Sequence, residues 1–166
     1  MACAGWSPDR FAYDHLVALI RVERQSRLSV EEAWRRLTDW QRHAAHAPLT
    51  TIIVTTPPPT GPGTRFVART GAGCFGFDDP MEVVRWEPPS GGRPGHCTLA
   101  KRGSVITGWA EIEVRLHARG SQVVWLEDLR VAKLPRLFDT PTAWSGRLFF
   151  GRAVAGLLSE QARDVI

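Results

Sequence analysis

Alternating apolar and polar residues near the start of the chain predict a β-strand at 15–24. Leu16, Ala18, Ile20 and Val22 share one side of this segment, the period of two that is typical of a half-buried strand. We therefore expect one face of the strand to point toward a core and the other toward solvent.

Helical spacing follows in the sequence LSVEEAWRRLTDW. Ser29 stands where a helix N-cap belongs, and Glu32 is placed three residues later to complete a capping box. Apolar residues then recur at helical intervals, which predicts an amphipathic helix with its charged residues on a solvated face. The apolar positions are Val30, Ala33, Trp34 and Leu37.

The middle of the chain alternates between β-rich segments and turns that contain glycine or proline. A short helix is predicted at 40–47, and strands at 50–56, 64–70, 81–87, 96–102, 105–117 and 122–131. The glycine-rich segment 71–80 is predicted to be a turn, so Asp78 and Asp79 are assigned first to turn chemistry and second to a cation site. Short connections between successive strands indicate an antiparallel meander.

A broad apolar stripe predicts a long helix that begins after Leu134 and ends near Leu158. Pro141 suits its first turn, and Thr140 suits its N-cap. Such a wide stripe is typical of a helix that lies on a sheet. Its members include Trp144, Leu148, Gly151, Ala155 and Leu158.

Composition and charge narrow the classes of function. A chain of 166 residues is expected to form one domain. The net charge of +4 comes from dispersed arginines without interleaved aromatics, so we expect no nucleic-acid partner. No apolar run is long enough for a bilayer, which predicts no stable membrane insertion. The three cysteines form no CxxC pair, which favours a reducing, cytoplasmic location.

The order of these elements resembles the START-like, or Bet v 1-like, superfamily (SRPBCC), also described as polyketide cyclase/dehydrase and lipid transport proteins. The resemblance covers 13–163, with 1–12 as an N-terminal extension. It rests on the strand leading to SVEEAWRRLTDW, on Pro48–Leu49, on the WEPP turn at 86–89 and on the last helix.

The resemblance implies an α+β helix-grip fold. In this fold a curved antiparallel β-sheet of six to seven strands wraps around a long C-terminal α-helix, with one or two short helices between strands 1 and 2. An elongated apolar cavity lies between sheet and helix. The implied function is binding of a hydrophobic small molecule, lipid-like or aromatic polyketide-like, by a monomer or homodimer. The alternative is a polyketide cyclase, aromatase or dehydratase. A protein-interaction adaptor is a third class.

Strand parity indicates which ionisable groups face the cavity. Glu127 falls on the more apolar side of its strand, where desolvation favours a neutral carboxyl group suited to proton transfer. Lys101 is inward by the same reasoning, and Arg147 borders the helical stripe. These three are the candidate catalytic residues, with Glu127 as general acid or base and a cation to polarise a carbonyl. The alternative is that Glu127 belongs to a purely structural ion pair, or that a bulge turns it outward.

Apolar residues of the same parity are expected to contact the ligand. The aromatic ones suit stacking on a planar molecule, while ordinary core packing is the favoured alternative for each one taken singly. The candidate ligand-binding residues are Trp86, Leu99, Ile112, Trp125, Leu129, Trp144, Leu148 and Gly151.

Other polar and aromatic positions are assigned less specific roles. His43 and His46 are three residues apart, but no acidic or cysteine partner stands at ligand spacing, so we expect a solvated pair and no metal. No nucleotide-binding or hydrolase motif is present, and no cofactor is expected. Trp109 lies at an outer position and, with Phe149, is a candidate oligomer contact.

Overall fold

A curled antiparallel sheet is the frame of the protein, whose computed structural model describes residues 19–72, 75–131 and 150–159. Within these residues the sheet has seven strands. The strands are β1 (Leu19–Ser26), β2 (Thr50–Val54), β3 (Arg65–Ala72), β4 (Phe75–Glu87), β5 (Gly95–Arg102), β6 (Ile106–His117) and β7 (Gly120–Val131).

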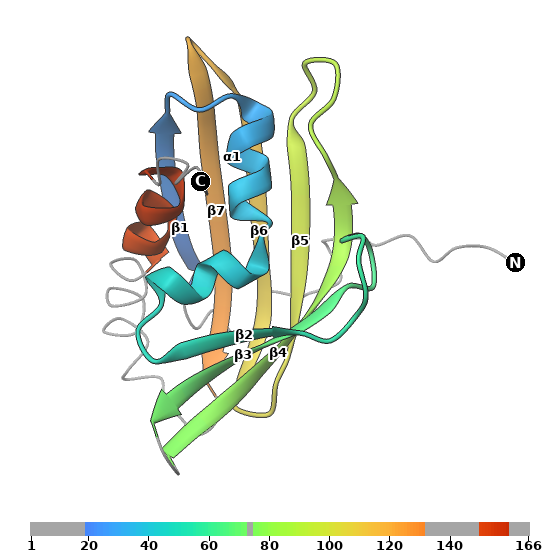
Figure 1. Ribbon diagram of the computed structural model, residues 1–166, viewed down its shortest axis with the longest axis vertical. Helices are drawn as coiled ribbons and strands as arrows, with labels where there is room; N and C mark the ends of the chain where they lie inside the picture. The colour runs from blue at the N-terminus through green and yellow to red at the C-terminus, as the bar shows by residue number, and fades with distance from the viewer. Residues whose placement is uncertain (1–18, 73–74, 132–149, 160–166) are drawn as a thin grey trace, which may run out of the picture.

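Neighbouring strands in the sequence pair with one another, except at one edge. The strand order is β1-β7-β6-β5-β4-β3-β2, so the first strand lies beside the last (Figure 1). That pairing is antiparallel and runs from Leu19 opposite Asp128 to Ser26 opposite Ser121. As a result β1 and β2 form the two edges, and the sheet curls so that one face is concave.

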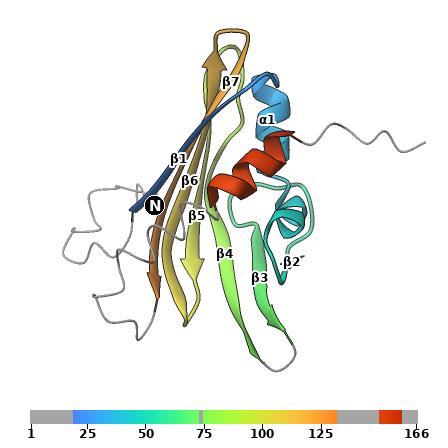
Figure 2. The same ribbon diagram turned by 90° about the vertical axis from the view of Figure 1, so that its left-hand side faces the viewer.

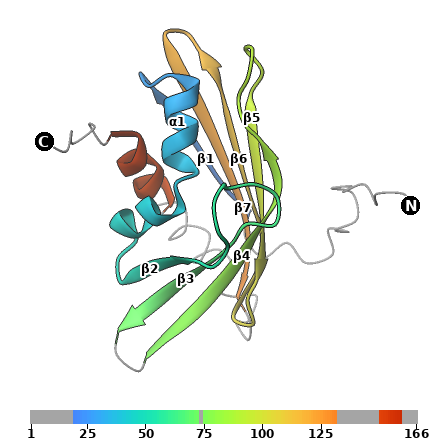
Figure 3. The same ribbon diagram turned by 45° about the vertical axis from the view of Figure 1, so that its right-hand side comes forward.

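Three helical segments lie on the concave side. They are α1 (Val30–Leu37), the 3₁₀-helix η2 (Trp40–His46) and a helix at 150–159. In Figures 2 and 3 the sheet bends around them, and β2, β3 and β4 curl beneath η2 and the last helix. This arrangement confirms the predicted helix-grip architecture. None of the helices within the described ranges has the length and apolar character needed to cross a membrane.

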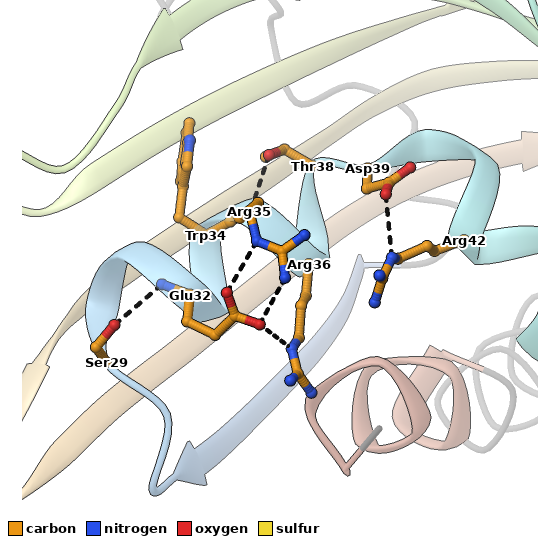
Figure 4. A network of polar contacts seen from close by, with 8 residues as sticks. All are labelled: Ser29, Glu32, Trp34, Arg35, Arg36, Thr38, Asp39 and Arg42. Carbon is orange, nitrogen blue, oxygen red and sulfur yellow. Dashed lines mark hydrogen bonds and ion pairs between the residues drawn. The ribbon is translucent and has the colours of Figure 1, made fainter. Parts of the chain in front are cut away.

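The start of α1 follows the predicted capping only in part. The hydroxyl of Ser29 accepts a hydrogen bond from the backbone N–H of Glu32 at 3.1 Å. The Glu32 carboxylate does not accept the second hydrogen bond of the capping box, from the backbone N–H of Ser29. It accepts hydrogen bonds from Arg35 and Arg36 instead (Figure 4). Arg36 is buried, which corrects the expectation that all charges of this segment are solvated.

One predicted boundary is corrected by the structure, and another lies outside the described residues. Strand β4 begins at Phe75, six residues before the predicted start, so Asp78 and Asp79 lie inside a strand rather than a turn. The pairing of β3 with β4 continues from Glu82 to Phe75, which extends the strand through a segment that contains glycine and proline. The predicted helix is described only at 150–159, so Thr140 and Pro141 lie outside the described residues.

Large side chains fill the space beneath α1, a region that we call the packed end of the inner face. The rings of Trp34 and Trp86 lie 5.0 Å apart, and Ile112 and Val114 are completely buried. Gly95 lies directly under Trp34. A Cβ at that position would come within 2.6 Å of the indole ring, so only glycine permits this approach. The packed end therefore leaves little free volume.

Candidate functional site

A cavity of about 290 Å³ lies at the other end of the concave face, between the sheet and the helix at 150–159. We call this region the hollow end. Its walls come from β2 to β7, from η2 and from the last helix. Among the apolar residues that line it are Trp40, Phe66, Leu99, Trp125, Leu129 and Leu157.

Small side chains leave this volume open. Ala68 on β3, Ala110 on β6 and Ala153 on the last helix all border the cavity, and Thr50 and Thr70 hydrogen-bond to each other at its rim. A larger side chain at any of the three alanines would occupy the space, as Trp34 and Trp86 do at the packed end. The side-chain sizes along the same strands thus determine where the interior is filled and where it is hollow.

Three charged side chains meet in the wall of the cavity. Lys101 Nζ lies 2.8 Å from Asp79 Oδ2 and 3.0 Å from Glu127 Oε1. All three residues are buried, with Glu127 at 1% exposure. The indole N–H of Trp125 donates to Glu127 Oε2 at 2.7 Å. We call Asp79, Lys101 and Glu127 the ionic cluster.

Strand register explains how these residues reach one another. Lys101 on β5 and Glu127 on β7 are separated by β6, and two strand spacings amount to roughly 9–10 Å. At this level β6 carries Gly108 opposite Lys101 and Ala110 opposite Glu127. Because neither has a bulky side chain, the lysine and the glutamate can meet over β6. Asp79 approaches from β4, two residues from the partner of Lys101.

The charge state of Lys101 follows from its surroundings. Burial alone would lower the pKa of Lys101, but the charges of Glu127 and Asp79, together with their hydrogen bonds, outweigh burial and raise the pKa above its ordinary value. Lys101 is therefore an ammonium group at neutral pH. An ammonium can donate hydrogen bonds and balance negative charge, but it cannot act as a nucleophile or a base.

His43 lines the same cavity and corrects the expectation of a solvated histidine pair. Its Nε2 lies 2.8 Å from the carbonyl oxygen of Leu37, so Nε2 carries the hydrogen and Nδ1 the lone pair. Burial lowers the pKa of His43, and this outweighs the Leu37 hydrogen bond that raises it. His43 is therefore a neutral imidazole, 5.7 Å from the ring of Trp125. His46 packs against Gly156, where any Cβ would overlap its ring.

The structure brings several of the predicted site residues together. Lys101, Glu127, Leu99, Trp125 and Leu129 all line the cavity. Their inward positions follow directly from the alternation within β5 and β7.

Other predicted ligand contacts lie elsewhere. Trp86 and Ile112 are at the packed end, where α1 covers them, and Gly151 is buried beside Arg24 rather than in the cavity wall. Trp109 is only partly exposed. The other candidates, Trp144, Arg147, Leu148 and Phe149, fall outside the described residues.

Two ionisable cavity residues, Asp79 and His43, were not selected from the sequence. Asp79 was assigned to a turn because of its glycine and proline neighbours. The alternation of Phe75, Phe77, Asp79 and Met81 was the signal that would have placed it on the inner face. Phe77 and Met81 both line the cavity. His43 had no comparable signal, since it lies on a short 3₁₀-helix whose burial depends on the sheet beneath it.

Metal and thiol chemistry find no support in this arrangement. Across the part of the chain that the structure describes, no three histidine, cysteine or acidic side chains gather in a way that could hold a metal ion. Burial raises the pKa of Cys97 to about 12, which excludes a thiolate at that position.

Comparisons with known proteins give the fold. Neither a protein-family model nor a curated protein matches the sequence. A hypothetical protein from Helicobacter pylori aligns over 96% of both chains, with a TM-score of 0.74 and 13% identity. A START superfamily protein from Mycobacterium smegmatis covers 84% of this chain and 96% of its own, with a TM-score of 0.65 and 10% identity.

A third similar structure is the Zhui aromatase/cyclase from a Streptomyces species. The alignment covers 89% of this chain and 98% of that one, with a TM-score of 0.60 and 12% identity. Identities this low carry information about architecture alone. The chain therefore has the START-like, or Bet v 1-like, helix-grip fold.

Proposed function

We propose that this protein binds a hydrophobic small molecule in the cavity at the hollow end. The observation that carries the proposal is an apolar cavity of about 290 Å³ enclosed by the sheet and the last helix. Small-molecule pockets typically measure about 300–1,000 Å³ and combine apolar walls with a few placed polar groups. The volume of this cavity lies at the lower limit of that range, and the ionic cluster with His43 supplies the polar groups.

The energetics of the hollow end support the same function. An unfilled interior forfeits dispersion contacts, and a buried ionic cluster is often no more stable than apolar residues of the same volume. Neither feature is needed for the stability of the fold, since the packed end shows that the same strands can be filled. A ligand would restore the missing contacts and would bury the apolar walls from water.

Uptake of an apolar fluorescent probe such as N-phenylnaphthylamine tests the proposal, with native mass spectrometry of the purified protein as a second readout. The matched variants are Ala153→Phe, which fills the cavity, and Ala155→Phe, which adds the same group to the exposed face of the same helix. We expect wild type and Ala155→Phe to bind the probe and Ala153→Phe to bind it at least about tenfold more weakly.

Two results would contradict the proposal. One is the absence of probe uptake by folded wild-type protein. The other is equal uptake by both phenylalanine variants, which would place the probe outside the cavity. If Ala153→Phe does not fold, Ala68→Leu fills the same space from β3 and replaces it.

A second candidate function is that of a cyclase-type enzyme, favoured by the placement of Glu127 and Lys101 in the cavity wall. The similar fold of an aromatase/cyclase agrees with this candidate. Lys101 would polarise a carbonyl and Glu127 would transfer a proton. In the structure, however, Lys101 already binds two carboxylates, which reduces its ability to polarise a third group. Binding is therefore the function that the geometry supports best.

Glu127→Gln separates the two candidates. For an enzyme, the rate of conversion of a poly-β-ketone substrate should fall at least about a hundredfold while probe uptake stays unchanged. If Glu127→Gln converts the substrate at the wild-type rate, Glu127 is not the group that transfers the proton.

A further inference from the structure

The ionic cluster has no hydrogen-bond donor to spare. The ammonium of Lys101 carries three hydrogens. It contacts Asp79 and Glu127, and its other near neighbour is the sulfur of Met81 at 3.7 Å. The N–H of Trp125 is already directed to Glu127. At the cluster, an incoming group that needs a donor would have to displace one of these contacts. Among the described residues, the unpartnered donor of the cavity wall is the buried indole N–H of Trp40, which is not part of the cluster.

Acceptors, by contrast, are in excess. Asp79 lines the cavity, and its side chain is only 8% exposed. Its Oδ1 atom is buried and has no hydrogen-bond partner among the described residues. Buried polar atoms in native proteins are nearly always hydrogen-bonded, because an unpaired one keeps the full cost of its lost hydration. Because Asp79 is one of the residues that line the cavity, a donor that reaches this carboxylate enters from the cavity.

The balance of charge points the same way. Two carboxylates surround one ammonium, and the walls around them are apolar. In such surroundings electrostatic interactions are poorly screened. The cluster therefore favours a positively charged or neutral donor and repels an anion.

We infer that the ligand is an amphipathic molecule whose polar end donates a hydrogen bond to Asp79, through a hydroxyl or ammonium group, and that the ionic cluster disfavours fatty-acid-like anions. The inference rests on the proposed function, since it assumes that the cavity binds a ligand. The small volume suits a single short chain or a few rings. The apolar remainder lies between Phe66, Leu129 and the last helix.

Competition with the fluorescent probe tests the inference with three molecules that share one tail: octanol, octylamine and octanoate. We expect octanol and octylamine to displace the probe at concentrations at least about tenfold lower than octanoate, a ratio that corresponds to one hydrogen bond to a charged group. The two donors distinguish a neutral from a cationic head group.

Asp79→Asn is the decisive variant, and Asp78→Asn is its matched control. Asp78 is the neighbouring residue, exposed and paired with Arg69 on the outer face. The asparagine amide at position 79 can donate where the carboxylate could only accept, so the preference for donors over octanoate should fall at least about tenfold. In Asp78→Asn the preference should equal that of wild type.

The outcomes separate the two proposals. Displacement of the probe by all three molecules at similar concentrations, or a donor preference that Asp79→Asn leaves intact, would overturn this inference and leave the proposed function standing. A probe that never binds would overturn both. If Asp79→Asn does not fold, as judged by circular dichroism, the ranking of the three molecules on wild type still decides.

Discussion

Strand β6 passes beneath α1 at Ile112 and Val114, and beneath the cavity at Ile106 and Ala110. At the packed end, tryptophans from α1 and β4 fill the interior so tightly that Gly95 cannot carry a side chain. At the hollow end the same strands carry alanines and an ionic cluster. The comparison shows that one sheet can hold two interiors with different tasks: the packed end supplies stability, and the hollow end supplies space and polarity.

The largest effect is expected where the hollow end depends on charge. Lys101→Met removes the ammonium and leaves Asp79 and Glu127 buried without a cation. Breaking a buried pair in this way costs about 3–5 kcal/mol of the free energy of unfolding. Urea denaturation measures it. Arg69→Met, which breaks the exposed ion pair with Asp78 between β3 and β4, serves as the control and should leave the midpoint almost unchanged. Equal midpoints for the two variants would mean that the buried carboxylates of Asp79 and Glu127 do not depend on Lys101 for neutralisation.

A matched pair of leucines tests the difference in packing directly. Leu37 is completely buried on α1, so Leu37→Ala should cost about 2–5 kcal/mol. Leu129 already borders empty volume, so Leu129→Ala loses fewer contacts and should cost roughly half as much or less. Urea denaturation of both variants measures this difference, provided that the free energy of unfolding depends on urea concentration with the same slope in each. Similar costs would show that the hollow end is closed in solution.

The smallest effect is expected at the surface of α1. Hydrogen bonds from Arg35 and Arg36 hold the pKa of Glu32 at about 2, well below the unfolded value of about 4.3. A lowered pKa stabilises the fold above the unfolded value, and this stabilisation disappears as the pH falls from about 4 to about 2. Glu32→Gln should therefore be less stable by about 1 kcal/mol at pH 7 and equal to wild type near pH 2.

Thermal denaturation at several pH values checks this prediction. Glu31→Gln, one position earlier and exposed, is the control and should follow wild type at every pH. A gap between Glu32→Gln and wild type that persists at low pH would assign the effect to packing rather than to charge.

Local alternation was enough to place some of the site. Glu127 and Lys101 were predicted to point inward because residues two apart on a strand share a face, a property that needs no knowledge of neighbouring strands. The same reasoning placed Leu99, Trp125 and Leu129. The order of helices and strands could also be predicted from the sequence, since capping and turn residues mark their boundaries.

The remaining features depend on which strands pair and on which helix covers which part of the sheet. Alternation along one strand contains no information about either. Asp79 joined the site because β3 extends β4 past the predicted turn. Trp86 and Ile112 had the right parity but came to lie under α1, so they fill the packed end. Which end is hollow depends on where three helical segments rest on the sheet, and that depends on the whole tertiary structure.

The pairing of β1 with β7 has a consequence for how the molecule is made. A ribosome releases the first strand long before the last, so β1 and the apolar side of α1 have no complete sheet to cover during most of synthesis. Contacts between such distant segments also slow folding, because the chain must close a long loop before they form. The nascent chain thus exposes an unpaired, aggregation-prone strand edge until β7 has been synthesised. A chaperone that shields this edge would raise the yield of folded protein.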